Sequence, residues 1–178
     1  MPISLYAAVV PSWIQILEAA RLWLVAAESA GLSDREIVDA RLIEDMLPLS
    51  YQVKSMVVHS VGAIEGVRAG VFSPDASPLP GSVGALRERL ADARTELERI
   101  EELEVDAFIG RAMRFQSDRH SVEFRAEDFL LSFSQPNFFF HATTAYDLLR
   151  MQGVPIGKAD FLGSPRARGV ETQETGDP

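Results

Sequence analysis

Residues 136–153 read PNFFFHATTAYDLLRMQG, and their apolar side chains recur at the spacing of a helix with one buried face. At about 100° per residue, Phe138 and Ala145 lie within roughly 80° of His141, while Asp147 lies on the opposite side. The sequence therefore predicts a titratable ring in the core of a helical protein. Such a ring needs a hydroxyl, a carboxylate, a metal or a ligand as its partner, because an unpaired buried polar group costs on the order of a few kcal/mol.

The composition is that of an ordinary globular protein. The chain has 178 residues, of which 47% are hydrophobic and 24% are charged, enough for one domain with a substantial core. We expect this domain to span residues 1–163. Residues 164–178 contain only one large apolar side chain, Val170, and are predicted to form a disordered polar tail. The sequence has no cysteine, which excludes disulfides, thiol catalysis and cysteine-ligated zinc.

Charge and hydropathy argue against nucleic acids and membranes as partners. The net charge is −9, and residues 87–106 hold eight carboxylates against four arginines, a surface that repels polyanions. Gln15, Glu18 and Arg21 keep the first apolar segment below the ~18 residues that a membrane span requires. The N-terminus also lacks the pattern of a secretion signal, so we expect a cytoplasmic protein.

The first helix has an unusually wide apolar surface. It is predicted from about Pro11, which suits a first helical turn, to Gly31, which suits a C-cap. Its polar residues cover only about 140° of the helix surface, and the remaining arc includes Trp13 and Trp23. Either this helix is central in the fold, or one of its flanks meets another subunit. The second alternative predicts a homodimer.

Capping patterns and periodicity predict three further helices. Residues 33–36 have the pattern of a capping box and begin a short helix. A long helix is predicted from Pro48 to Gly70, followed by a proline-rich surface loop over 71–81 and a third long helix from Ser82. The apolar residues of this third helix recur at alternating three- and four-residue steps: Leu86, Leu90, Ala93, Leu97, Ile100 and Leu103.

The C-terminal part of the chain completes the predicted fold. Alternating apolar residues on either side of QSDRHS (residues 116–121) indicate a small β-hairpin. The last helix is expected to begin near Glu127, to be interrupted at Pro136 and to continue to Gly153. Together these elements predict an all-α fold, an antiparallel four-helix bundle with one long crossover and a small β-hairpin before the last helix.

Three segments, in this order, resemble a family of bacterial and fungal proteins. They are ARLIEDMLPL at residues 40–49, QPNFFFHATTAYDLLR at 135–150 and GVPIGKADFLG at 153–163. The family is the domain-of-unknown-function family nineteen-ninety-three, which looks like a branch of the DinB/YfiT-like helical bundles. The likeness extends from Leu5 to Gly163. It implies a helical bundle of a kind that is often dimeric and often carries a metal.

The same resemblance implies where a metal would bind. The usual site of DinB/YfiT-like proteins has three histidines, one on the second helix and two spaced four residues apart on the fourth. His59 and His141 match two of these positions, but the third is Ala145, which has no lone pair. Three protein ligands are the usual minimum for a catalytic zinc, so the implied site is degenerate. Asp45 is the carboxylate that could complete it as a third ligand.

The three histidines also have structural interpretations. His141 is expected to be a core histidine that bonds a neighbouring hydroxyl or carbonyl, with a ligand or metal role as the alternative. His59 is expected to be a half-buried boundary residue. His120 lies in the predicted hairpin turn and should be solvated.

The remaining candidate pocket residues are Asp45, Asn137 and Tyr146. Asp45, with Arg41, fits a structural ion pair or helix cap. Asn137 fits the N-cap of the last helix, with substrate contact as the alternative. Tyr146 is expected to pack its ring against another helix.

Two functions remain open from the sequence. Glycine-rich phosphate loops, GxSxG and HExxH are absent from the sequence, so any enzymatic hypothesis depends on His59 and His141. The first function is a non-catalytic or small-molecule-binding dimeric bundle with no tightly bound cofactor. The alternative is a metal-dependent enzyme of the thiol-transferase or hydrolase type, in which the two histidines and a carboxylate hold a divalent metal.

Overall fold

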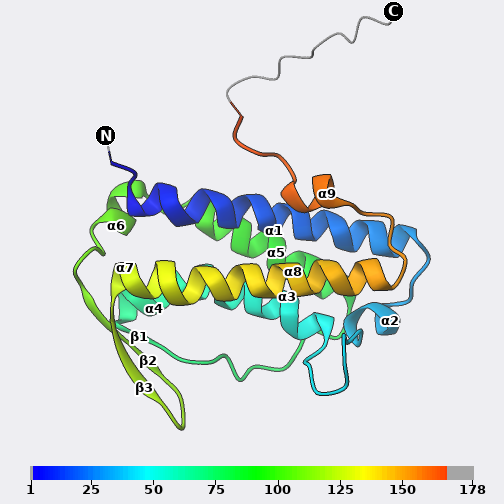
Figure 1. Cartoon of the computed structure of the whole chain (residues 1–178), viewed down its shortest axis with the longest axis horizontal. Coiled ribbons are helices and arrows are strands. Elements are labelled where there is room, and N and C mark those ends of the chain that lie inside the picture. Colours follow the sequence, from blue (N-terminus) through cyan, green and yellow to red (C-terminus); the bar gives the residue numbers. More distant parts are fainter. Residues whose placement is uncertain (1, 168–178) are drawn as a thin grey trace, which may run out of the picture.

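The computed structural model describes residues 2–167. This part of the chain is mostly helical, with one small three-stranded sheet at one end (Figure 1). The long helices lie side by side and are α1 (Leu5–Ser29), α3 (Leu49–Val58), α4 (Val61–Ala69), α5 (Val83–Glu98) and α8 (Gln135–Met151). The short helices are α2 (Asp34–Val38), α6 (Glu102–Asp106), α7 (Ala126–Asp128) and α9 (Lys158–Leu162). The predicted capping box at the start of α2 is confirmed.

Helix α1 begins earlier than the sequence suggested. Ser4 is its N-cap, and the Ser4 hydroxyl accepts a hydrogen bond from the Ala7 N–H at 3.1 Å. Pro11 consequently lies inside the helix, where it removes one main-chain hydrogen bond. The predicted start at Pro11 is therefore wrong. Near the other end, Gly31 adopts the left-handed conformation (φ 83°) directly after the helix.

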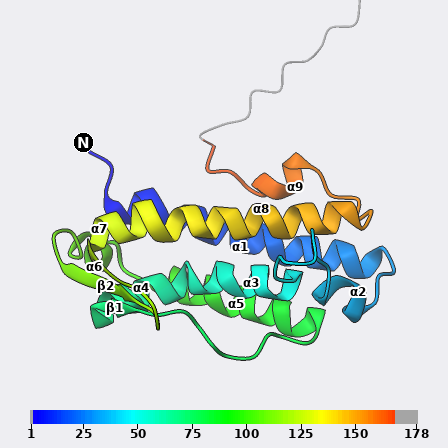
Figure 2. The ribbon, with the colours of Figure 1, turned by 60° about the horizontal axis from the view of Figure 1, so that its bottom comes forward.

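Helix α1 is central in the fold. Its buried residues are Leu5, Val9, Val10, Trp13, Ile16, Leu17, Ala19, Ala20, Trp23, Leu24 and Ala27. They contact α5, α8 and α9, which surround the helix on several sides (Figures 1 and 2). This central position accounts for the wide apolar arc. By length and composition alone α1 could also cross a membrane, but half of its most apolar window is buried inside the folded chain.

The second long helix is broken. The segment predicted as one helix from Pro48 to Gly70 forms α3 and α4, which are separated at His59 and Ser60. Ser60 is fully buried, and its hydroxyl donates to the Met56 carbonyl oxygen at 2.8 Å. A serine that bonds back to its own helix competes with the main-chain ladder and bends the helix. The break leaves His59 as the C-terminal cap of α3.

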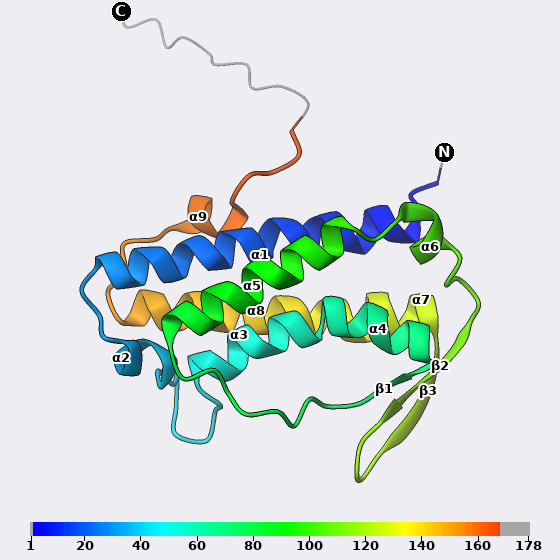
Figure 3. The same cartoon turned by 180° about the vertical axis from the view of Figure 1, so that it is seen from behind.

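The sheet contains a strand that the sequence did not predict. The predicted hairpin is confirmed as β2 (Ala112–Gln116) and β3 (Ser121–Arg125), which pair antiparallel. Strand β1 (Val71–Phe72) adds to β2 in parallel and gives the order β1-β2-β3. A two-residue strand is too short to show an alternating pattern. The sheet lies at the end of the molecule where α4 ends and α7 begins (Figure 3).

Gly66 allows β1 to lie against α4. A Cβ atom at position 66 would lie only 2.9 Å from the Cβ atom of Phe72. Gly70 ends α4 in the left-handed conformation (φ 74°), and the chain continues directly into β1. The short strand is therefore fixed by two glycines, one that makes the turn and one that makes room for Phe72.

The last long helical segment runs without interruption. Helix α7 continues into a π-helical segment, η1 (Phe129–Ser134), and then into α8. The predicted interruption at Pro136 is wrong. Pro136 donates no main-chain hydrogen bond, and the wider turn of η1 directly before it accommodates this loss. The prediction that Asn137 is the N-cap of the last helix is also wrong. Its side-chain amide donates to the Phe133 carbonyl oxygen at 2.7 Å inside the continuous helix.

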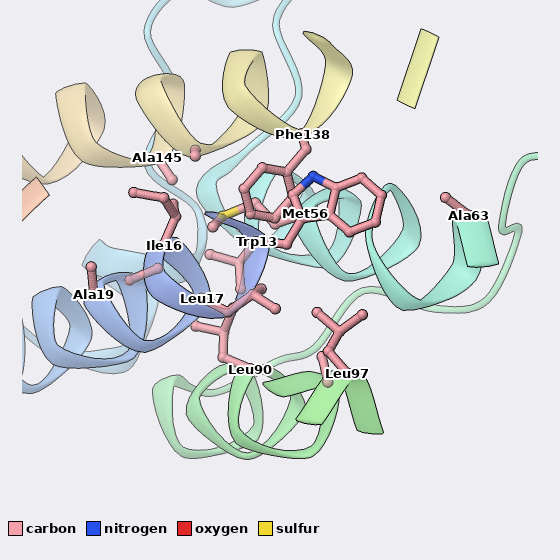
Figure 4. Close-up of a cluster of buried hydrophobic side chains, with 14 of the residues drawn as sticks. Trp13, Ile16, Leu17, Ala19, Met56, Ala63, Leu90, Leu97, Phe138 and Ala145 are labelled. Carbon is pink, nitrogen blue, oxygen red and sulfur yellow. The ribbon is translucent and has the colours of Figure 1, made fainter. Parts of the chain in front are cut away.

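The hydrophobic core lies between α1, α3, α5 and α8. Trp13 is fully buried there, with its ring centroid 6.1 Å from that of Phe138 (Figure 4). The predicted stripe of the third helix is buried from Leu86 to Leu97. Leu103 is instead 81% exposed, because α5 ends at Glu98 and the separate helix α6 follows.

The C-terminal segment returns to α1. After α9, the Arg166 side chain lies 3.5 Å from the Ser12 hydroxyl on α1. Residues 164–167 belong to the predicted tail and have no helix or strand. The rest of the predicted tail, residues 168–178, lies outside the described residues.

Candidate functional site

The fold brings His59 and His141 together. His59 ends α3, and His141 lies near the middle of α8. Their rings stack with a centroid distance of 5.8 Å and an interplanar angle of 16°. His141 is 8% exposed and His59 is half-buried, which agrees with their expected positions in the core and at its boundary.

Each histidine is contacted by a polar residue from the opposite helical segment. His141 Nδ1 lies 2.7 Å from Oε1 of Gln52 on α3. His59 Nδ1 lies 3.4 Å from the hydroxyl oxygen of Ser134, the last residue of η1. Gln52 precedes His59, and Ser134 precedes His141, by about two helical turns, so the two contacts are reciprocal. The partner of His141 is thus the carbonyl oxygen of a side-chain amide.

Burial keeps both imidazoles neutral at pH 7. Loss of hydration lowers the pKa of His141 to about 4. The pKa of His59 is also lowered to about 4, first by burial and second by the neighbouring His141. A neutral imidazole has one N–H donor and one lone pair, so each ring can donate one hydrogen bond and accept another.

His59 lines a pocket of about 200 Å³ at the end of α3. Aromatic rings form part of its wall, with the centroids of Phe72 and Phe133 at 5.4 Å and 5.8 Å from that of His59. The other lining residues are Tyr51, Lys54, Ser55, Val58, Pro74, Asp75 and Phe115. An apolar wall with a few polar groups is typical of small-molecule sites. A larger, more open groove of about 520 Å³ adjoins it along α4 but contains no histidine.

Lys54 fixes one side of this pocket. Lys54 is 3% exposed, and its ammonium donates to the carbonyl oxygens of Asp75 at 2.9 Å and Ser77 at 2.5 Å. It also lies 3.3 Å from the Asp75 carboxylate, so three acceptors match its three N–H donors. Burial by itself would raise the pKa of Asp75, but hydrogen bonds from Ser77 and Lys54 outweigh it and lower the pKa. The loop over 73–82 is thereby attached to α3.

Asp45 does not join the histidine pair. It is exposed in the loop before α3 and does not line the pocket. Arg41, its predicted ion-pair partner, instead donates to the Met46 carbonyl oxygen at 2.6 Å. Among residues 2–167, no ion pair joins Arg41 to Asp45. The carboxylate that lines the pocket is Asp75.

Tyr146 and His120 do not belong to the candidate site. The Tyr146 ring packs edge-on against Trp23 at 5.6 Å and Phe161 at 5.5 Å, as the sequence predicted. His120 is exposed at the end of the hairpin turn, also as predicted. Neither residue lines the pocket beside His59.

The side chains present do not fit a three-ligand metal site. Position 145, where the resemblance implies the third ligand, carries the methyl group of Ala145, which is 1% exposed among the core residues of Figure 4. In the described part of the chain, no group of three His, Asp or Glu side chains is placed to hold a metal ion. Asp75 already binds Lys54 and Ser77. Two imidazoles alone fall short of the usual ligand number.

Besides Asp75, three polar residues of the site were missed from the sequence: Gln52, Lys54 and Ser134. Gln52 would have been the easiest of them to predict, because it lies on the same side of its helix as His59. Lys54 resembles a solvated charge, since lysines on amphipathic helices are almost never fully buried. Ser134 lies in a segment where no periodic pattern indicates the π-helical turn.

Comparison with known proteins identifies the family and the fold. No curated protein matches the sequence. The crystal structure of a DinB family member protein from Shewanella denitrificans is similar, with a TM-score of 0.77, 24% sequence identity, and coverage of 93% of this chain and 96% of that chain. This likeness shows a DinB-like fold. The family described as "Domain of unknown function (DUF1993)" matches residues 5–162. The chain therefore belongs to the DUF1993 family and has a DinB-like fold.

Proposed function

We propose that this protein is an antiparallel four-helix bundle that binds a small uncharged molecule in the pocket beside His59. In this architecture α1, the broken pair α3–α4, α5 and α8 are the four helices, and the loop over 73–82 is the long crossover. The observation that carries the proposal is a neutral imidazole in the wall of a partly aromatic pocket of about 200 Å³.

The charges around the pocket favour an uncharged ligand. Lys54 and Asp75 are the charged residues of the lining, and they pair with each other. A charged ligand would have to give up hydration without gaining a free counter-charge, which is costly in a buried site. His59, Tyr51 and Ser55 can each offer a hydrogen bond, and the phenyl rings offer an apolar contact.

A pocket-filling variant tests this proposal. Saturation-transfer NMR of the full chain would be recorded with phenol, benzamide and benzyl alcohol as uncharged probes. Ser55→Leu should abolish the transfer, because Ser55 is buried in the lining. Ser29→Leu, the same change at an exposed position of α1, is the control and should retain it. No transfer in the unmodified protein, or equal transfer in Ser55→Leu, would contradict the proposal.

The metal-dependent alternative is less well supported. It requires His59, His141 and a carboxylate around one ion, whereas Asp45 is exposed in a loop and Asp75 is engaged by Lys54. We therefore favour the binding function without a protein-held metal.

The homodimer and the cytoplasmic location stay predictions. The apolar arc of α1 that suggested a dimer is largely covered by α5, α8 and α9 of the same chain, although Leu22 remains 50% exposed. The mass measured by light scattering at micromolar concentration would show whether the protein is a dimer. Twice the chain mass would support a second subunit, and the mass of one chain would contradict it.

A further inference from the structure

The geometry points to Gln52 as a positioning residue that holds the neutral His141 ring in the tautomer with its proton on Nδ1. Gln52 is 2% exposed and lies between two groups that its side-chain amide can bond. On one side its Nε2 donates to the Leu47 carbonyl oxygen at 2.8 Å. On the other side its Oε1 lies 2.7 Å from His141 Nδ1.

The Leu47 carbonyl fixes which way this amide is turned. A main-chain carbonyl oxygen only accepts hydrogen bonds, so the group facing it must be the NH₂ of Gln52. The reverse orientation would place two acceptor oxygens against each other. The start of α3 does not use the Leu47 carbonyl. The Leu49 N–H bonds to the Ala40 carbonyl oxygen, and the N–H groups of Tyr51 and Gln52 bond to the Pro48 carbonyl oxygen.

The orientation of the Gln52 amide then fixes the tautomer of His141. Because Gln52 presents Oε1, which is only an acceptor, the nitrogen it faces must carry the proton. His141 is neutral, so its other nitrogen, Nε2, keeps a lone pair. Within residues 2–167, the buried side-chain nitrogen and oxygen atoms without a partner are Trp13 Nε1 and Arg87 Nε. His141 Nε2 is not among them and has no hydrogen bond in that range, so solvent reaches it.

In this single tautomer, Nε2 of His141 is always a hydrogen-bond acceptor. His141 is not among the residues that line the pocket beside His59. The tautomer follows from the hydrogen bonds alone and does not depend on the proposed function. His59 differs, because a hydroxyl such as that of Ser134 can either donate or accept and leaves its tautomer free.

Long-range ¹H–¹⁵N NMR of the full chain at pH 7 tests the assignment. The sequence has only three histidines, so their ring signals can be separated. His141 should show a protonated Nδ1 and an unprotonated Nε2 in a single tautomer, while the exposed His120 serves as an internal reference. A protonated Nε2 in His141 would overturn the inference.

Two variants separate positioning from simple packing. Gln52→Met keeps the length of the side chain but removes the acceptor, and it should let His141 populate both tautomers. Gln52→Glu keeps an acceptor, so it should preserve the Nδ1-protonated form and raise the pKa of His141 by about 1–3 units. Should Gln52→Met not fold, an unchanged His141 pKa in Gln52→Glu would still contradict the role. If the tautomer is as expected but the Ser55→Leu experiment fails, the ligand pocket is wrong and the positioning role stands.

Discussion

The phenyl ring of Phe161 in α9 stacks on the indole ring of Trp23 in α1, with a centroid distance of 5.3 Å and an interplanar angle of 16°. The Trp23 N–H also donates to the Asp160 carbonyl oxygen at 2.9 Å. The Gln15 side-chain amide of α1 donates to the Leu162 carbonyl oxygen of α9 at 2.6 Å. A helix of five residues is thus joined to the central helix by this aromatic stack and two hydrogen bonds.

Loss of this contact should destabilise the whole domain. We expect Phe161→Ala to lower the free energy of unfolding by about 2–3 kcal/mol, because it removes a partly buried aromatic ring. Leu162→Ala is the control, since Leu162 is 43% exposed, and it should cost less than about 1 kcal/mol. Urea melts of both variants measure the difference, and equal losses would show that α9 is not anchored by its phenylalanine.

Stability should fall as the pH drops from 7 to 5. The folded-state pKa values of His59 and His141 are about 4, below the ordinary value of 6.5, so the unfolded chain takes up protons first. Their contribution is fully present above about pH 6.5 and is lost toward pH 4, with about 1–2 kcal/mol per histidine lost by pH 5. The double variant His59→Gln, His141→Gln should show a flatter profile in urea melts. A slope unchanged by the double variant would contradict this assignment.

Gly66→Ala should be destabilising by about 1–3 kcal/mol, because the new methyl group would meet Phe72 at 2.9 Å. Gly62→Ala, in the same helix, is the matched control. Its methyl group would meet no atom closer than 3.9 Å, so the usual gain in helix propensity should leave stability unchanged or slightly improved. Thermal melts that rank the two variants in the opposite order would show that β1 moves away from α4 at little cost.

The two lysines of the sequence should differ strongly in reactivity. Lys54 is 3% exposed with its donors engaged, whereas Lys158 is exposed. Brief acetylation followed by mass spectrometry should modify Lys158 and spare Lys54. Lys54→Met should lower the free energy of unfolding by about 2–4 kcal/mol, because it strands the loop acceptors, while Lys158→Met should have little effect. Rapid acetylation of Lys54 would show that the loop over 73–82 is not held by it.

Protein purified without a histidine tag should contain no stoichiometric transition metal, because only two ligands are in place. Elemental analysis with one zinc, nickel or iron per chain would contradict this. Ala145→His should not create a tight zinc site. Position 145 is 1% exposed in the core, so the added ring should instead destabilise the protein by about 1–3 kcal/mol. A rise in melting temperature of this variant on addition of zinc would show that the third ligand position can be restored.

The helices could be predicted from the sequence because their signals are local. The capping box at Ser33, the cap at Ser82 and the C-terminal glycine at position 70 each involve residues within one turn of the helix end. The predicted helix starts and breaks were wrong where a second local signal competed with the first. Pro11 suggested a helix start that Ser4 provides, and Ser60 broke a helix whose apolar periodicity was continuous.

The site could be predicted only in part, because its chemistry depends on contacts between distant segments. The two histidines could be placed together by the family resemblance. The Gln52–His141 hydrogen bond joins residues 89 positions apart, and the Lys54 contacts reach a loop with no periodic pattern. The carboxylate was misassigned to Asp45 because nearness in sequence was its only support. Asp75 reaches the pocket because the loop over 73–82 passes beside α3.

The central position of α1 has a consequence for biosynthesis. This 25-residue helix leaves the ribosome before α5, α8 and α9, the segments that cover it in the finished protein. Until they follow, the nascent chain carries an apolar helix with length and composition that also suit a membrane span. Such surface makes incomplete chains prone to aggregation. Ribosome-bound fragments that end before α8 should therefore recruit chaperones more strongly than the full-length chain.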